Sequence, residues 1–114
     1  MTTSAALEVS AEQALRLVSG GADVLDVRDL WEWTEGHAPQ AHHVPLPDLP
    51  IARTPRWTAQ RVVVLCRSGS RARTAVQLLR TRGVEAYAVA GGMGAWRDAG
   101  GALVSTNGAP GLVA

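Results

Sequence analysis

The sequence predicts an α/β fold organised around a parallel β-sheet. Short apolar runs, typical of buried strands, occur at Asp23–Val27, Val62–Leu65 and Tyr87–Ala90. Segments whose apolar residues recur at helical spacing lie between these runs, and glycines end them. Strands and helices that alternate along a chain favour a parallel sheet covered by helices.

The length and composition indicate one domain. The chain has 114 residues, 46% of them hydrophobic, which is near the commonest domain size and enough for a single core. It contains no internal repeat or long linker, so we expect a single domain over residues 1–114. Residues 105–114 are rich in small residues, Gly and Pro, and we expect them to form a C-terminal tail.

Charge and apolar patterning give no reason to expect a nucleic-acid or membrane partner. The formal net charge is +1, and no apolar run approaches the roughly 20 residues that span a bilayer. The first residues, Met1–Ala6, lack the basic region and long apolar core of a signal peptide. A single cysteine rules out an internal disulfide and a multi-cysteine metal site, and it fits a reducing compartment. We therefore expect a cytoplasmic protein.

The first quarter of the chain predicts a strand, a helix and a second strand. Leu7–Val9 is a candidate short strand. Ser10 and Gln13 form a capping-box pattern, which places Ser10 at the N-cap of a helix. That helix should end at Gly20–Gly21, and Asp23–Val27 should follow as a buried strand.

A short helix and a turn are expected next. Leu30–Thr34 favours a helix in which Trp31 and Trp33 cannot share a face, so at least one of them should stay partly exposed. Residues 36–41 form a turn, in which we expect His37 to bond nearby backbone rather than act as a base.

Neighbouring histidines and several prolines mark the middle of the chain. Ala41–Val44 predicts a short strand. Its His42 and His43 would point to opposite faces, so a two-histidine metal site is not expected. The proline-rich connection that follows predicts a short helix near Leu49–Arg53.

The only cysteine stands between a strand and a helix. The run Val62–Leu65 ends at Cys66, a polar loop with a glycine follows, and Arg71–Arg82 shows helical spacing. Tyr87–Ala90 predicts the last strand, and Met93–Asp98 predicts a short helix after it.

The loop at the cysteine has the composition of an anion-binding site with a reactive thiolate. Backbone N–H groups in a tight loop and at a helix N-terminus favour negative charge. Arg67 and Arg71 add fixed positive charge, which favours the thiolate form of Cys66. An inert buried cysteine is the alternative, but two arginines beside it would be hard to solvate. The candidate site comprises Cys66 with Arg67, Ser68, Gly69, Ser70 and Arg71, in which Gly69 permits close approach and the serines supply hydroxyl donors.

Charged residues also mark the end of the strand Asp23–Val27. Asp26 and Arg28 lie at the carboxyl edge of the predicted sheet, where ligands gather in open α/β folds. Two roles fit this placement: a layer that supports the cysteine loop, or an ordinary ion pair that ties two loops together. We expect scaffold residues rather than participants in the chemistry.

Four segments, in order and with matching spacing, resemble motifs of the single-domain rhodanese-like sulfurtransferases. The cysteine loop resembles the active-site loop of that family. Asp26-Val27-Arg28 with Glu32 resembles its first-strand motif. Gly36-His37-Ala38-Pro39-Gln40-Ala41, followed by Val44-Pro45-Leu46, resembles its Gly-His-Ile-Pro-Gly-Ala segment, and Gly91-Gly92-Met93-Gly94-Ala95-Trp96 resembles its Gly-Gly-x-x-x-Trp signature. The resemblance covers about residues 8–104, and four ordered motifs are far more specific than one.

The resemblance implies a three-layer domain with a central, mostly parallel sheet and helices on both faces. It also implies sulfur transfer, in which the Cys66 thiolate takes the outer sulfur of thiosulfate or a related small anionic donor and becomes a persulfide. A thiophilic acceptor, either a thiol or a protein, would then remove the sulfur. Arg67 and Arg71 would hold the donor, and no metal or organic cofactor is required.

Two other functions stay open at this point. The same loop would serve a non-catalytic module that carries sulfur between protein partners. Cysteine phosphatases and some arsenate reductases place five residues between Cys and Arg, whereas four separate Cys66 from Arg71, which suits one sulfur atom better than a phosphate. Gln40 stands where the family usually has glycine, which would strain the turn if a left-handed backbone is needed there.

Overall fold

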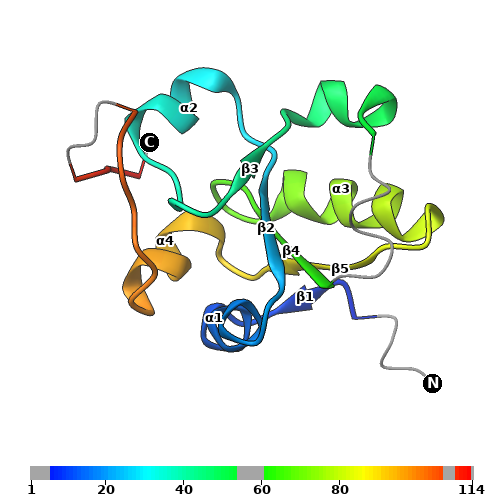
Figure 1. The fold of residues 1–114 in the computed structure, drawn as a ribbon, viewed down its shortest axis with the longest axis horizontal. Helices are drawn as coiled ribbons and strands as arrows, with labels where there is room; N and C mark the ends of the chain where they lie inside the picture. The colour runs from blue at the N-terminus through cyan, green and yellow to red at the C-terminus, as the bar shows by residue number, and fades with distance from the viewer. Residues whose placement is uncertain (1–5, 54–60, 107–109, 114) are drawn as a thin grey trace.

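The computed structural model contains a five-stranded sheet in which all neighbouring strands run parallel (Figure 1). The structure describes residues 6–53, 61–106 and 110–113. The strand order is β1-β5-β4-β2-β3. The strands are β1 (Glu8–Val9), β2 (Asp23–Asp26), β3 (His42–His43), β4 (Arg61–Leu65) and β5 (Glu85–Val89). The predicted parallel α/β sheet is confirmed, and each strand lies within two residues of its expected bounds.

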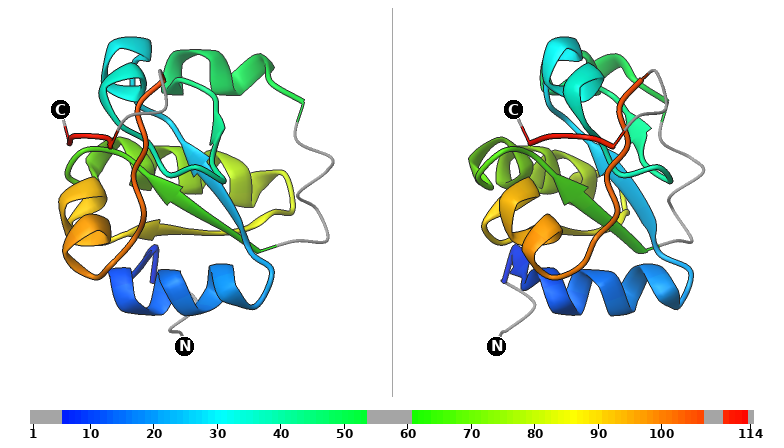
Figure 2. Two further views of the ribbon diagram at one scale, coloured as in Figure 1. Left: turned by 60° about the vertical axis from the view of Figure 1, so that its left-hand side comes forward. Right: turned by 90° about the vertical axis from the view of Figure 1, so that its left-hand side faces the viewer.

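Helices cover both faces of this sheet, as the family resemblance implied (Figure 2). The helices are α1 (Ala11–Ser19), α2 (Leu30–Glu35), α3 (Ser70–Thr81), α4 (Gly92–Asp98) and the 3-10 helix η2 (Leu46–Ile51). On one face α1 and α4 pack against the sheet, and on the other face α3 and η2 do so. Within the described residues, no helix is long and apolar enough to cross a membrane.

The valine-rich strand β4 shows how the two cores form. Val62 and Val64 belong to the core shared with α3, whereas Val63 and Leu65 belong to the core shared with α1 and α4. All four side chains are fully buried. Because a strand with helices on both faces has no wet side, its sequence is a continuous apolar run rather than an alternating one.

Capping boxes begin both helices of the N-terminal half. Ser10 Oγ accepts the N–H of Gln13 at 3.1 Å, and Gln13 Oε1 accepts the N–H of Ser10 at 2.8 Å, as predicted. At α2, Glu32 Oε1 accepts the N–H of Asp29 at 3.0 Å. This second bond holds the Glu32 carboxylate close to the N-terminus of α2, near the carboxyl edge of the sheet.

Two local expectations in the middle of the chain resolve differently. The helix expected near 49–53 is η2, which begins earlier, at Leu46, and has 3-10 rather than α geometry. Pro50 lies inside it and has no N–H to donate, which favours a short 3-10 segment over a regular α-helix. Gln40 carries no left-handed strain, because every described residue with a positive φ is a glycine.

The described residues 110–113, which lie in the expected C-terminal tail, make backbone hydrogen bonds to the rest of the domain. The N–H of Leu112 donates to the carbonyl of Glu35 at 3.0 Å, and the N–H of Gly111 donates to that of Leu103 at 3.3 Å. Gly36 permits this contact, because a Cβ there would collide with the backbone of Leu112. The segment therefore packs against the end of α2 through backbone bonds, for which small residues leave room.

Candidate active site

Cys66 directly follows β4 and lies at the start of α3, with only 1% of its surface exposed. Its Sγ accepts the backbone N–H of Gly69 at 2.9 Å and that of Ala72 at 3.4 Å. Both donors belong to the first turn of α3 or to its N-cap, so otherwise unpaired amides of a helix N-terminus point at the sulfur. Such a cradle of N–H groups favours negative charge on the atom it surrounds.

A glycine makes this cradle possible. Gly69 has a φ of 118°, in the left-handed region that side chains rarely adopt, and it is the N-cap of α3. The helix begins at Ser70, one residue before the expected start. This tight turn brings the amides of Gly69 and Ala72 to the same sulfur atom.

Three other residues of the loop are exposed, unlike Cys66 and Gly69. They are Arg67, Ser68 and Ser70. In the described part of the chain, the donors to Cys66 Sγ are backbone amides, and the role of the two serine hydroxyls as donors in the site stays a prediction. These three side chains are instead exposed to solvent close to Cys66 in the sequence.

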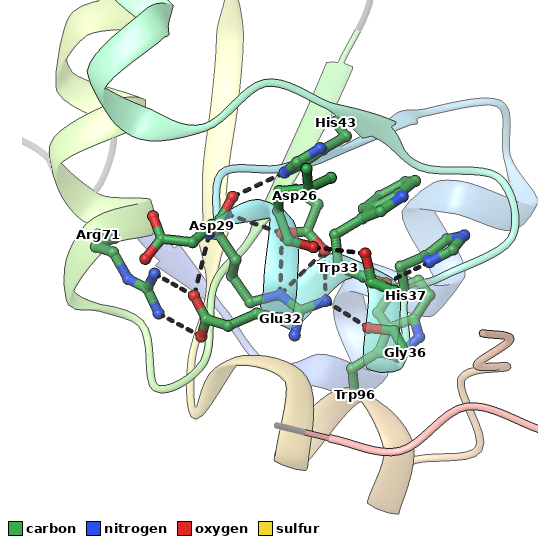
Figure 3. A network of polar contacts seen from close by, with 12 residues as sticks. Asp26, Asp29, Glu32, Trp33, Gly36, His37, His43, Arg71 and Trp96 are labelled. Atoms are coloured by element: carbon green, nitrogen blue, oxygen red, sulfur yellow. Dashed lines mark hydrogen bonds and ion pairs between the residues drawn. The ribbon is translucent and has the colours of Figure 1, made fainter. Parts of the chain in front are cut away.

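An ion pair from α2 holds the end of the cysteine loop (Figure 3). Arg71 Nη1 and Nη2 lie 2.7 and 3.0 Å from the two carboxylate oxygens of Glu32. The hydrogen bond to Arg71 keeps the pKa of Glu32 below its ordinary value, against the opposing effect of burial. The same bond raises the pKa of Arg71. Sequence reasoning assigned Glu32 only to a motif, although its position three residues after Asp29 was a signal that it lies near the start of α2.

The start of α4 supports the loop from another side. The N–H of Met93 donates to the carbonyl of Cys66 at 2.9 Å. Gly92 has a φ of 61°, and a Cβ on it would collide with the carbonyls of Cys66 and Arg67. Sequence reasoning did not include Gly92 in the site, and the glycine pair before α4 was the available signal, because close backbone approach requires glycine.

The predicted residues Asp26 and Arg28 form a fully buried ion pair (Figure 3). Arg28 Nη2 lies 2.8 Å from Asp26 Oδ2 and donates to the carbonyl of Gly36 at 2.6 Å. Arg28 Nη1 is also buried and has no hydrogen-bond partner within the described residues. The pair thus joins the end of β2 to the turn after α2, while Glu32 makes the direct contact with the cysteine loop. Support of that loop by Asp26 and Arg28 stays a prediction.

Trp33 of α2 stacks on the imidazole of His37 in the following turn and on that of His43 in β3 (Figure 3). Its ring centroid lies 3.7 Å from that of His37 and 4.7 Å from that of His43. His37 Nδ1 is 2.8 Å from the carbonyl oxygen of Trp33, which confirms that this histidine bonds nearby backbone. Trp31 is 61% exposed, so the two tryptophans use different faces, as expected. Among the described residues, no group of three or more His, Cys, Asp and Glu side chains could hold a metal ion.

Comparison with known proteins identifies the family. A model of the rhodanese-like domain matches residues 10–99. The chain therefore belongs to the rhodanese-like domain family. All four motifs that carried the resemblance lie inside the matched range.

The relatives include proteins from several bacteria and an archaeon. An uncharacterized protein from Synechocystis sp. is 35% identical over 88 residues, which are 76% of this chain and 49% of that protein. The match thus spans about half the length of this curated relative. The rhodanese-like domain of a protein from Anabaena sp. has a TM-score of 0.75 and 25% identity, over 87% of this chain and 79% of that one.

Two further solved structures share the fold. A rhodanese-related protein from Thermoplasma volcanium has a TM-score of 0.73 and 25% identity, over 85% of this chain and 96% of that one. A thiosulfate sulfurtransferase from Pseudomonas aeruginosa has a TM-score of 0.74 and 24% identity, over 96% of this chain and 22% of that one. At that identity the second likeness shows a common fold.

Proposed function

We propose that this chain is a sulfurtransferase that moves sulfane sulfur through a persulfide on Cys66. The Cys66 thiolate attacks the outer sulfur of thiosulfate or a related small anionic donor. A new S–S bond forms at Cys66 while the S–S bond of thiosulfate breaks, and sulfite leaves with the bonding electron pair. A thiophilic acceptor then attacks the outer sulfur of the persulfide, which restores the thiolate.

The observation that carries this proposal is the pair of backbone amides on the sulfur. The amides of Gly69 and Ala72 lie 2.9 and 3.4 Å from Cys66 Sγ. Donors already aimed at an anion need little reorganisation during reaction, so they favour both the attacking thiolate and the waiting persulfide. The buried position of Cys66 also limits the access of water and large reactants.

The two loop arginines contribute to donor binding in different ways. Both terminal nitrogens of Arg71 are engaged by Glu32, so Arg71 mainly positions the loop and contributes its positive field. Arg67 directly follows Cys66 and is exposed, so its guanidinium is free to contact the sulfite portion of the donor. The remaining loop residues, Ser68 and Ser70, offer hydroxyl donors to the same donor molecule.

The engagement of Arg71 also weighs against phosphatase or arsenate reductase chemistry. Those reactions need a guanidinium fork that receives the tetrahedral oxyanion. Here Glu32 occupies the fork of Arg71 that Nη1 and Nη2 form, at 2.7 and 3.0 Å. A sulfur carrier that exchanges only with protein partners is the remaining alternative, and it uses the same Cys66 persulfide.

Intact-protein mass after incubation with thiosulfate tests the proposal. Wild type should gain the mass of about one sulfur atom, and cyanide should remove that mass and yield thiocyanate. Cys66→Ser should gain none. A Cys66→Ser variant with full thiosulfate:cyanide turnover would refute the proposal. A gain from a protein persulfide donor but none from thiosulfate would support the carrier instead.

A further inference from the structure

The first turn of α2 presents two large apolar side chains to solvent. Leu30 is 67% exposed and Trp31 is 61% exposed. Burying such side chains is favourable, so neighbouring exposed ones mark a surface that can bind a partner. Within the described residues, the other strongly exposed large apolar side chains, Ile51 and Leu112, stand apart from each other in the sequence.

This apolar pair lies beside the cysteine loop. Glu32 directly follows Trp31 and reaches Arg71, the last residue of the loop, at 2.7 Å. Leu30 and Trp31 directly precede Glu32 in α2, so their backbone lies next to the residue that reaches the cysteine loop. Helix α2 therefore holds the loop with its buried carboxylate and presents apolar side chains at the same end of the sheet.

Not every arginine in and next to the cysteine loop is paired with a carboxylate of the described residues. Arg71 and Arg73 are ion-paired with carboxylates at 2.7 and 2.9 Å. Arg67 is exposed and has no carboxylate within ion-pair distance in the described part of the chain. Asp29 adds negative charge near Arg71, whose pKa it helps to raise. A partner with a carboxylate near its thiol would complement Arg67.

The position of the sulfur restricts the shape of the partner. Cys66 is only 1% exposed, whereas Arg67 and Ser68, which follow it in the chain, are exposed. A thiol on a flat protein surface would meet the exposed side chains of Arg67 and Ser68 before it reached the sulfur. A thiol on a protruding segment can reach the sulfur while the partner residues on either side of that thiol contact Arg67 and Ser68.

From these features we infer that Leu30, Trp31 and Arg67 form a docking surface for a protein sulfur acceptor. The acceptor presents its cysteine on a protruding segment that carries apolar residues on one side and a carboxylate on the other. Its thiolate attacks the outer sulfur of the Cys66 persulfide, the S–S bond at Cys66 breaks with its electron pair left on Sγ, and the acceptor leaves as a persulfide. The inference rests on the proposed function.

Transfer from preformed Cys66 persulfide to three small acceptors tests this surface. The first is cyanide, the second a short peptide with leucines before its cysteine and glutamates after it, and the third a peptide of equal length with Ser and Gly at those positions. Wild type should transfer sulfur to the apolar-acidic peptide about tenfold faster than to the Ser/Gly peptide. The double variant Leu30→Ser/Trp31→Ser should lose most of this preference and keep the cyanide rate.

Ile51→Ser is the matched control. Ile51 is 88% exposed on η2, whose carbonyls are bound by Arg82 at the far end of α3 from Cys66. A helix of 12 residues spans about 18 Å, so this substitution lies far from the loop. The control should behave as wild type in all three transfers.

Three outcomes would overturn the inference in distinguishable ways. If wild type and the double variant showed the same preference between the two peptides, Leu30 and Trp31 would not form a docking surface, and the persulfide chemistry would be unaffected. A dimer by light scattering that the double variant converts to monomer would assign the surface to a second copy of this chain. Failure of wild type to form any persulfide would refute the proposed function itself.

Discussion

Two carboxylate–arginine pairs begin in the same short segment of the chain but join different parts of the molecule. Asp26 and Arg28 are two positions apart, both side chains are fully buried, and the pair also binds the carbonyl of Gly36. Glu32 and Arg71 are 39 positions apart, and 32% of the Arg71 side chain is exposed. The first pair closes one stretch of chain on itself, whereas the second joins α2 to the cysteine loop.

The comparison separates stability from chemistry. A fully buried pair has a large desolvation cost, so the protein depends on it mainly because removal of one partner leaves an uncompensated charge. A partly hydrated pair contributes less to folding, but its bidentate geometry defines where two elements meet. We therefore expect the free energy of unfolding to depend chiefly on the first pair and sulfur uptake chiefly on the second.

The largest effect on stability should come from Arg28→Met. This change leaves the Asp26 carboxylate buried without its partner, and we expect the free energy of unfolding to fall by about 3–5 kcal/mol. Urea denaturation would measure it. Asp26→Leu/Arg28→Met should recover much of the loss, since both charges are then absent. A loss below about 1 kcal/mol for the single variant would mean that this pair is not the stronger support.

Gly92→Ala tests the backbone contact that supports the same loop from α4. The new Cβ would meet the carbonyls of Cys66 and Arg67 at a left-handed position, and we expect a loss of about 2–3 kcal/mol. Gly94→Ala is the control in the same helix, because nothing lies within 4 Å of its Cβ position. The control should be stabilised by about 0.5–1 kcal/mol. Equal thermal shifts in the two variants would contradict the close approach.

Glu32→Gln should have a small effect on the free energy of unfolding and a larger effect on the rate of persulfide formation. Loss of the charge-assisted pair should lower the free energy of unfolding by only about 1–2 kcal/mol, because Arg71 is partly hydrated. The released arginine should slow persulfide formation by roughly tenfold, the cost of a misplaced loop group. Rapid-quench mass measurements would give that rate, and an unchanged rate would show that the ion pair does not position the loop.

The stability contribution of Glu32 should depend on pH. Arg71 lowers the pKa of Glu32 in the folded state below the ordinary value of 4.5. The contribution is therefore complete above about pH 4.5 and is lost as the pH falls through the lower folded-state value. The difference in unfolding free energy between wild type and Glu32→Gln should be largest near neutral pH and shrink in acid. A difference that stays constant down to about pH 3 would contradict this assignment.

The smallest effect is expected from Glu8→Gln. Glu8 pairs with Arg73 at 2.9 Å, but 37% and 46% of the two side chains are exposed. Exposed pairs contribute about 0–1 kcal/mol, so denaturation should change by less than about 0.5 kcal/mol and persulfide formation should not change. If Glu8→Gln slowed persulfide formation as much as Glu32→Gln, the effect would not be specific to the Glu32–Arg71 pair. That result would contradict the role of Glu32 in positioning the cysteine loop.

Features that depend on neighbouring residues could be predicted from the sequence. The capping box at Ser10, the buried run of β4 and the loop that follows it are all specified within a few positions. The Glu32–Arg71 pair could not be predicted in this way, because its partners are 39 positions apart. The packing of residues 110–113 was missed for the same reason, since their small residues indicate a loop but not what the loop contacts.

The sequence by itself determined the family motifs, the parallel α/β class and the thiol at a loop that begins a helix. These features follow from periodicity, turn chemistry and the N–H groups of a helix start, which act over a few residues. The tertiary structure alone decided that Glu32 holds Arg71 and that Gly92 lies against the loop. Those contacts join elements that are distant in the sequence. The periodicity of a helix or strand does not indicate which distant element it packs against.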